Sequence, residues 1–273
     1  MHLNVRHTTT YTYDPEANGI GLRLKLFPAN SAAQSCSDWS VTVNGDTVEP
    51  LLTDAAGDRS GLWHSPTPQK SVEIVASGTF ATTDTAGVLR DVREAMPPAV
   101  YLRDTKITEP SPAIRALADG IEADDTLAKL HVLSEAVAEA VAYKSGATDA
   151  ATTAAEAIVL AEGVCQDQAH VFIAAARCMG IPARYVAGYL LDPDLDDDAT
   201  EQTHAWAEAH VGSLGWVGFD ITHQLCPTDA YVRLASGFDA DDAAPIRGTF
   251  VGEIEQTLTT AVQISQATAQ SQQ

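Results

Sequence analysis

Hydrophobic and polar residues alternate in short runs along the first 85 residues of the chain. These runs are rich in Thr, Val and Tyr, and turn-forming residues such as Asn44 and Gly45 separate them. Alternation with a period of two is typical of strands, and an Asn-Gly pair favours a two-residue hairpin turn. The segment 41–48 therefore predicts a hairpin, and 71–80 predicts another strand. We expect residues 1–95 to form a strand-rich N-terminal domain, built as a half-barrel or a β-sandwich.

The pattern becomes helical after a segment that is rich in proline. Residues 96–112 contain four prolines, a density that suits a connector between domains and not the interior of an element. Beyond it, apolar residues recur at helical spacing within 127–141. Four helices are expected, and they begin near residues 111, 125, 153 and 165. The last should end before Gly180 and Pro182, because glycine favours a helix terminus and proline prevents continuation.

Strand-like patterns return after the last helix, at 183–191, 203–211 and 215–221. Helices followed by strands indicate an α+β fold, and we assign the core to residues 113–255. The acidic segment 192–201 is expected to be a loop between two of these strands. Residues 256–273 are rich in Gln, Thr, Ser and Ala, which predicts a tail that is a frayed helix or disordered.

Composition and charge narrow the classes of function. The chain has 273 residues, of which 45% are hydrophobic and 19% charged, and this excludes wholesale disorder. Its 37 acidic and 16 basic side chains give a net charge of −21, a field that repels phosphate backbones and anionic membrane surfaces. No apolar run approaches the roughly 18 residues that span a bilayer. We expect an acidic, globular, cytoplasmic protein without nucleic-acid or membrane partners.

Cysteine is the first residue type that suggests chemistry. The four cysteines are widely spread with no CxxC pair, so neither a disulfide framework nor a zinc site is predicted. Cys165 stands where a loop becomes a helix, in the segment GVCQDQAH. Unpaired backbone N–H groups and the positive end of the helix dipole there favour a nucleophilic thiolate. In isolation, however, such a cysteine is more often a small buried hydrophobe.

Two later motifs strengthen the catalytic interpretation. His204 lies in THAWAE and Asp220 ends GWVGFD, 39 and 55 residues after Cys165. In a triad of this kind the imidazole takes the thiol proton and returns it to the leaving amine, while the carboxylate orients the imidazole. Each residue alone has a plainer explanation, so the inference rests on the combination.

The register of two strands decides whether the histidine and the aspartate can meet. If Val211 pairs with Trp216, Asp220 points away from the face that carries His204. If Val211 pairs with Gly215, or a bulge has the same effect, Asp220 lies diagonal to His204 and within reach of it. We predict the second register.

Four motifs of the core, in their order and spacing, support a family resemblance. They are GVCQDQAH, GIPARYVAGYL, THAWAEAHV and GWVGFDIT. The segment 153–224 resembles the transglutaminase-like core of bacterial proteins described as cysteine proteases, and the first 85 residues resemble the strand-rich domain that accompanies this core. The resemblance implies a papain-like fold with Cys165 as nucleophile, His204 as base and Asp220 as orienting acid.

The chain departs from the family pattern beside the acid, where the family often has Pro and Asn and this chain has Ile221 and His223. The first donor for an oxyanion is expected to be the backbone N–H of Cys165. The second stays open, with Gln166 and Gln168 near enough in sequence to be candidates.

These features predict a thiol-dependent enzyme that hydrolyses amide bonds in peptide or protein substrates through an acyl-enzyme on Cys165, without cofactor or metal. Two alternatives remain open. The acyl-enzyme could be resolved by an amine, which would give transglutaminase-type acyl transfer. The fold could also serve as a non-catalytic module that binds a peptide.

Overall fold

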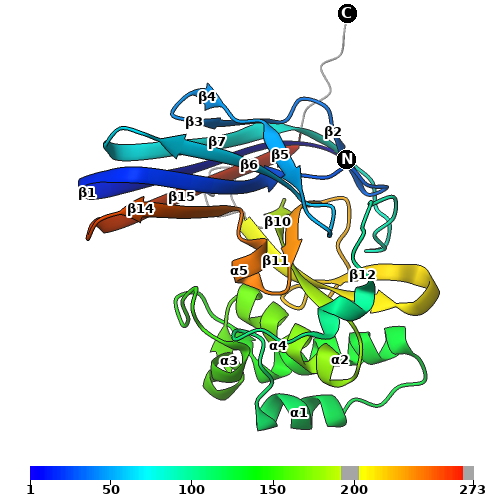
Figure 1. Ribbon diagram of the computed structural model, residues 1–273. Coiled ribbons are helices and arrows are strands. Elements are labelled where there is room, and N and C mark those ends of the chain that lie inside the picture. The colour runs from blue at the N-terminus through cyan, green and yellow to red at the C-terminus, as the bar shows by residue number, and fades with distance from the viewer. Residues whose placement is uncertain (192–202, 267–273) are drawn as a thin grey trace, which may run out of the picture.

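A computed structural model describes residues 1–191 and 203–266 of the protein. A strand-rich region lies at the top of Figure 1 and a layer of helices at the bottom, with a four-stranded sheet between them. This is the α+β architecture that the sequence predicts. The acidic segment 192–201 falls outside the described residues.

The strand-rich region is a nine-stranded antiparallel sheet that curves as a half-barrel. Its strands are β1 (His2–Phe27), β2 (Gln34–Cys36), β3 (Ser40–Val43), β4 (Asp46–Thr47), β5 (Pro50–Thr53), β6 (Arg59–Ser65), β7 (Gln69–Thr82), β14 (Ile246–Val251) and β15 (Glu255–Gln266). The predicted hairpin at Asn44-Gly45 joins β3 to β4 and is confirmed, as is the strand at 71–80, which lies within β7.

The long strand β1 organises this sheet. Its first half pairs with β7 on one side and β15 on the other, and its second half pairs with β6 and β14. Buried residues alternate along the first half of β1, as expected for a strand with one face on a core. The inward side chains include Leu3, Val5 and Leu24, each almost without exposed surface.

The prediction of a frayed or disordered tail from 256 is wrong as far as the structure describes it. Residues 255–266 form β15, which pairs with β1 from Leu3 to Asp14, and β14 also pairs with β1 although it lies within the predicted core of 113–255. The polar composition misled the prediction because only Val262 and Ile264 of β15 are buried. The edge of β1 supplies the hydrogen-bonding partner that a local pattern does not reveal.

The core consists of helices packed on one face of a smaller sheet. The elements that lie outside the half-barrel are the 3-10 helix η1 (Pro98–Leu102), α1 (Pro112–Asp119), α2 (Thr126–Ala140), β8 (Ala142–Tyr143), α3 (Ala154–Leu160), β9 (Glu162–Gly163), α4 (Cys165–Cys178), β10 (Ala183–Leu190), β11 (Thr203–Val211), η2 (Gly212–Leu214), β12 (Gly215–Phe219), β13 (Tyr231–Gly237) and α5 (Ala240–Ala243). The four predicted helices and three predicted strands are all present, with boundaries within about two residues.

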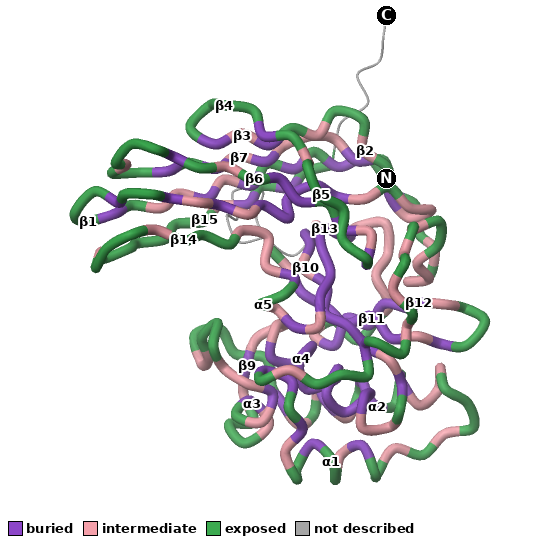
Figure 2. The backbone as a smooth tube through the Cα atoms, viewed as in Figure 1, coloured by how far each residue is buried: buried purple, intermediate pink, exposed green. Residues whose placement is uncertain are grey.

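Helix α4 is the central element of the core. It contacts β10 and β11 of the four-stranded sheet, whose order is β12-β11-β10-β13, and α1, α2 and α3 surround it. Every residue from Asp167 to Arg177 is buried, and the tube around the α4 label in Figure 2 is largely purple. A helix buried on all sides cannot shift without disturbing its neighbours, so its first residue is held in place. No helix in the described residues is both long enough and apolar enough to cross a membrane.

A chain of buried ion pairs joins the core to the half-barrel. Glu208 of β11 accepts hydrogen bonds from Arg184 of β10 and Arg233 of β13, with Nε–O distances of 2.7 and 2.9 Å. Arg233 also lies 3.4 Å from Asp58, which pairs in turn with Lys25 of β1 at 3.7 Å. Strand β13 therefore belongs to both regions: its Tyr231 reaches toward β11, while its alternate residues pack into the half-barrel core.

Candidate active site

Cys165 is the first residue of α4 and is half-buried. The carboxylate of Asp167 closes the first turn by accepting a hydrogen bond from the backbone N–H of Val164 at 2.8 Å, and the hydroxyl of Thr148 donates to the same oxygen at 2.6 Å. Gly163 is needed before the helix because a Cβ there would lie 2.8 Å from the Asp167 side chain. The thiol thus stands at a helix N-terminus in a fixed position.

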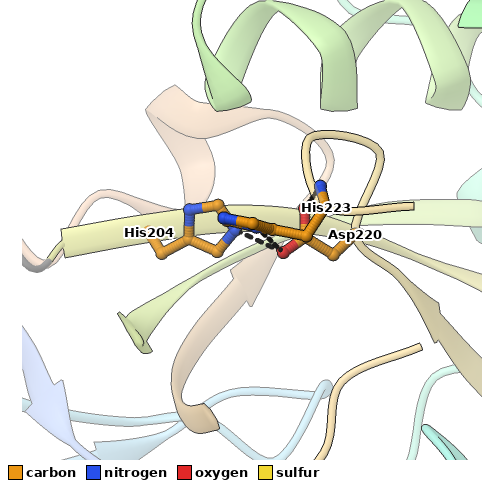
Figure 3. A group of neighbouring side chains, drawn as sticks. All are labelled: His204, Asp220 and His223. Carbon is orange, nitrogen blue, oxygen red and sulfur yellow. Dashed lines mark hydrogen bonds and ion pairs between the residues drawn. The ribbon is translucent and has the colours of Figure 1, made fainter. Parts of the chain in front are cut away.

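The register of β11 and β12 is the predicted one. Val211 pairs with Gly215 across the η2 turn, and the ladder continues to Ala207 and Phe219. Asp220 follows directly, so its side chain lies on the same face as His204. The Nε2 atom of His204 lies 2.7 Å from Oδ2 of Asp220 (Figure 3).

Asp220 is buried and accepts hydrogen bonds on both oxygens. Oδ2 contacts His204 and also accepts from Nδ1 of His223 at 2.8 Å and from the Tyr231 hydroxyl at 2.6 Å. Oδ1 accepts the backbone N–H groups of Thr222 and His223 at 3.0 and 3.2 Å. Burial alone would raise the pKa of this carboxyl, but the hydrogen bonds and the neighbouring imidazole outweigh burial and hold it well below its usual range. Asp220 is therefore a fixed negative charge.

His204 links this charge to the thiol. Burial lowers its pKa, but hydrogen bonds with Asp220 and Cys165, together with the charges of both groups, outweigh burial and raise the pKa to about 10. Because Nε2 faces Asp220, Nδ1 is the ring nitrogen left for the sulfur. The structure thus holds His204 against Asp220, and Cys165 is among the groups that act on the imidazole and favour its protonated form at neutral pH.

Three further side chains belong to the site in roles that the sequence did not predict. Tyr231 and His223 bind Asp220 directly. Gln168, a candidate oxyanion donor by sequence, donates to the carbonyl of Val141 at 2.8 Å and accepts from the Thr222 hydroxyl at 2.7 Å. Gln168 thus ties α4 to the turn after Asp220, and its side chain is committed to structure. The position of His223, three residues after Asp220, was the sequence signal that could have indicated its contact with this carboxylate. Tyr231 could not be found in that way because it comes from a separate strand.

The rings of the site form an aromatic wall. His204 lies beside Trp206 and Tyr231, with ring centroids 6.3 and 6.0 Å away. His170 of α4 is fully buried, and its Nε2 accepts the backbone N–H of Ala240 at 3.0 Å.

The described residues contain one group that could hold a metal ion. It consists of His204, Asp220 and His223, whose ligand atoms all lie within 4.8 Å of one another. The sequence predicted no metal ion, because the chain has no CxxC pair of the kind that typical zinc sites use.

The fold and the site together define a class of protein: an α+β protein in which a half-barrel of strands accompanies a core that holds a cysteine, a histidine and an aspartate side by side. Comparison with known families agrees. Residues 115–221, which include all three side chains, match the transglutaminase-like superfamily, and residues 3–80 match the bacterial transglutaminase-like N-terminal region. The chain therefore joins a transglutaminase-like core to a bacterial transglutaminase N-terminal domain.

Relatives and solved structures resemble the chain over most of its length. An uncharacterized protein of Mycobacterium tuberculosis is 28% identical, covering 89% of this chain and 86% of that protein. An uncharacterized protein of Mycobacterium leprae is 26% identical, covering 96% of this chain and 98% of its own. A crystal structure from Cytophaga hutchinsonii, described as a "putative cysteine protease", superimposes with a TM-score of 0.76 at 23% identity, covering 97% of this chain and 90% of that one. This last likeness shows the shared fold.

Proposed function

We propose that this protein is a thiol-dependent hydrolase of amide bonds in peptide or protein substrates, and that it acts through an acyl-enzyme on Cys165. The observation that carries the proposal is the contact of His204 with the buried Asp220 at 2.7 Å, with Cys165 at the start of α4 among the groups that raise the pKa of the same imidazole. The superfamily of the core is consistent with this chemistry.

In the proposed reaction the thiol proton passes to Nδ1 of His204, which gives a thiolate and an imidazolium. The thiolate attacks the carbonyl carbon of the substrate, and the backbone N–H groups at the start of α4 stabilise the oxyanion. The C–N bond then breaks as the imidazolium gives its proton to the leaving amine. Water, deprotonated by His204, hydrolyses the thioester and releases the acid. Asp220 keeps the imidazole oriented and balances its positive charge throughout.

The activation step can be tested without knowing the substrate. We expect iodoacetamide to alkylate Cys165 at pH 6 to 7 faster than Cys178, which serves as an internal reference thiol of similar exposure. Burial raises the pKa of Cys178, so it should react slowly at that pH. An ordinary thiol is only a few per cent ionised at pH 7, so a Cys165 that gives its proton to His204, as the proposal requires, should react on the order of tenfold faster or more. Replacing His204 by Ala should abolish that advantage.

Activity itself is tested with a peptide and isopeptide library, with Cys165→Ala as the inactive control. Cleavage by the native protein alone supports hydrolysis. Incorporation of a labelled primary amine into a glutamine donor, with release of ammonia and without cleavage of the peptide, would show that the protein catalyses acyl transfer and not hydrolysis. If Cys165 reacts no faster than Cys178, and His204→Ala changes nothing, the protein is a peptide-binding module and the proposal is wrong.

A further inference from the structure

Two imidazoles converge on one carboxylate oxygen beside the thiol. Nε2 of His204 and Nδ1 of His223 lie 2.7 and 2.8 Å from the same Oδ2 of Asp220 (Figure 3). The rings stand nearly edge to face, with centroids 5.2 Å apart. Within residues 1–191 and 203–266 no other group of three potential ligands is as close.

We propose that His204, Asp220 and His223 form a binding site for a divalent transition ion of the Zn²⁺ type, and that occupation of this site reversibly switches off Cys165. The binding itself follows from the donor atoms alone. The inhibitory effect rests on the proposed function, because it concerns the base that activates the thiol.

The donor set matches this class of ion. Imidazole nitrogen together with carboxylate oxygen suits zinc and its neighbours in the first transition row, whereas Mg²⁺ and Ca²⁺ prefer shells of several oxygens. Zinc binds these atoms at about 2.0–2.2 Å, so an ion would occupy the space that the two bridging protons now fill. The nitrogen and oxygen atoms must separate by a few tenths of an ångström to admit it.

The site has both access and support. The side chain of His223 is 35% exposed, while those of His204 and Asp220 are buried, so the ion can enter from the His223 side. Tyr231 and the backbone N–H groups of the following turn hold the Asp220 carboxylate in place. Such outer contacts orient a metal-binding carboxylate.

Occupation of the site would remove the base. With the metal ion on Nε2, a neutral His204 ring carries its remaining proton on Nδ1, the nitrogen that faces Cys165. A ring in this state has no lone pair available to accept the thiol proton. The Nε2 proton leaves to solvent when the metal binds, so no imidazolium remains to pair with the thiolate, and the sulfur takes one proton from solvent to become a thiol. Removal of the ion by a chelator restores the original proton arrangement.

The binding test uses Co²⁺ as a spectroscopic probe and Zn²⁺ in calorimetry, on the full chain. We expect one ion per chain, visible d–d absorption, and no intense thiolate-to-metal charge-transfer band. Cys165→Ala should bind the ion with unchanged affinity. His223→Asn should bind the ion more weakly. Removal of an outer-shell partner lowers metal affinity roughly 10- to 100-fold, and we expect the loss of a direct ligand to be at least as large. His210→Asn, on the same strand but outside the site, should bind as the native protein does.

The inhibition test compares the rate of Cys165 alkylation with and without Zn²⁺, each variant against its own metal-free rate. Zinc should slow the alkylation of Cys165 in the native protein and in His210→Asn, and EDTA should restore the metal-free rate. In His223→Asn zinc should slow alkylation far less. Mg²⁺ should have no effect. The metal site is refuted if the native protein binds no ion, if His223→Asn binds as tightly as the native protein, or if Cys165→Ala abolishes binding. Stoichiometric binding without any change in alkylation would preserve the site and refute its coupling to the thiol.

Discussion

The buried Glu208 offers a quantitative test of how the core is held together. Its carboxylate pairs with Arg184 at 2.7 Å, and the two side chains are 4% and 0% exposed. Burial would raise the pKa of Glu208, but the charges of Arg233 and Arg184 outweigh burial and keep the pKa below its usual value. Replacement by Gln keeps the shape and removes the charge, which leaves two buried guanidinium groups without their shared partner.

The expected cost follows from burial and not from distance. Removal of one partner of a buried ion pair lowers the free energy of unfolding by about 3–5 kcal/mol. This is a large part of the roughly 5–15 kcal/mol by which a typical domain is stable. The pair Lys144–Glu162 has the same 2.7 Å separation, but its side chains are 58% and 44% exposed. Exposed pairs contribute only about 0.2–1 kcal/mol, because water screens the charges. Glu162→Gln is therefore the matched control.

The assay is urea denaturation at pH 7, with the free energy of unfolding compared among the native protein, Glu208→Gln and Glu162→Gln. We expect Glu208→Gln to lose several times more stability than Glu162→Gln, and a variant that cannot be recovered folded would agree with this. Equal losses, within about 1 kcal/mol, would refute the reasoning that burial gives the Glu208 pairs their importance.

Three further predictions follow from single features of the structure. Burial lowers the pKa of His170 to about 4, and its neutral Nε2 accepts the N–H of Ala240. Between pH 6.5 and pH 4 the unfolded chain therefore binds a proton at this histidine that the folded chain does not bind. The contribution of His170 to stability should thus be full above pH 6.5 and fall by about 3 kcal/mol toward pH 4, and urea titrations of His170→Gln should show a slope smaller by one proton than those of the native protein. A Cβ at Gly188 would lie 2.3 Å from the carbonyl oxygen of Val232, so Gly188→Ala should lower the melting temperature sharply in calorimetry, and an unchanged value would contradict the tight packing of β10 on β13. Deletion of 255–273 should expose the edge of β1 and promote self-association, which sedimentation would detect; a monomer as stable as the native chain would refute this role of β15.

Much of the local structure could be predicted because its causes lie close together in the sequence. The helix starts at Ser111, Asp125 and Thr153 were visible because the same side chains accept a backbone hydrogen bond in the first turn. The register that places Asp220 beside His204 could be derived from the alternation of side chains and the length of one turn. The location of the candidate site was therefore accessible before the structure.

What the sequence by itself determined was the order of the elements, the α+β class, and the cysteine, histidine and aspartate whose spacing suggested a shared site. Only the tertiary structure showed that β15 returns to the edge of β1, that β13 brings Tyr231 to Asp220, and that His223 shares the carboxylate with His204. The physical reason is the range of the interactions. Caps, turns and periodicity act over a few residues, whereas strand pairing and buried charges join residues far apart in the chain. The energy of those long-range contacts depends on which surfaces meet when the chain folds.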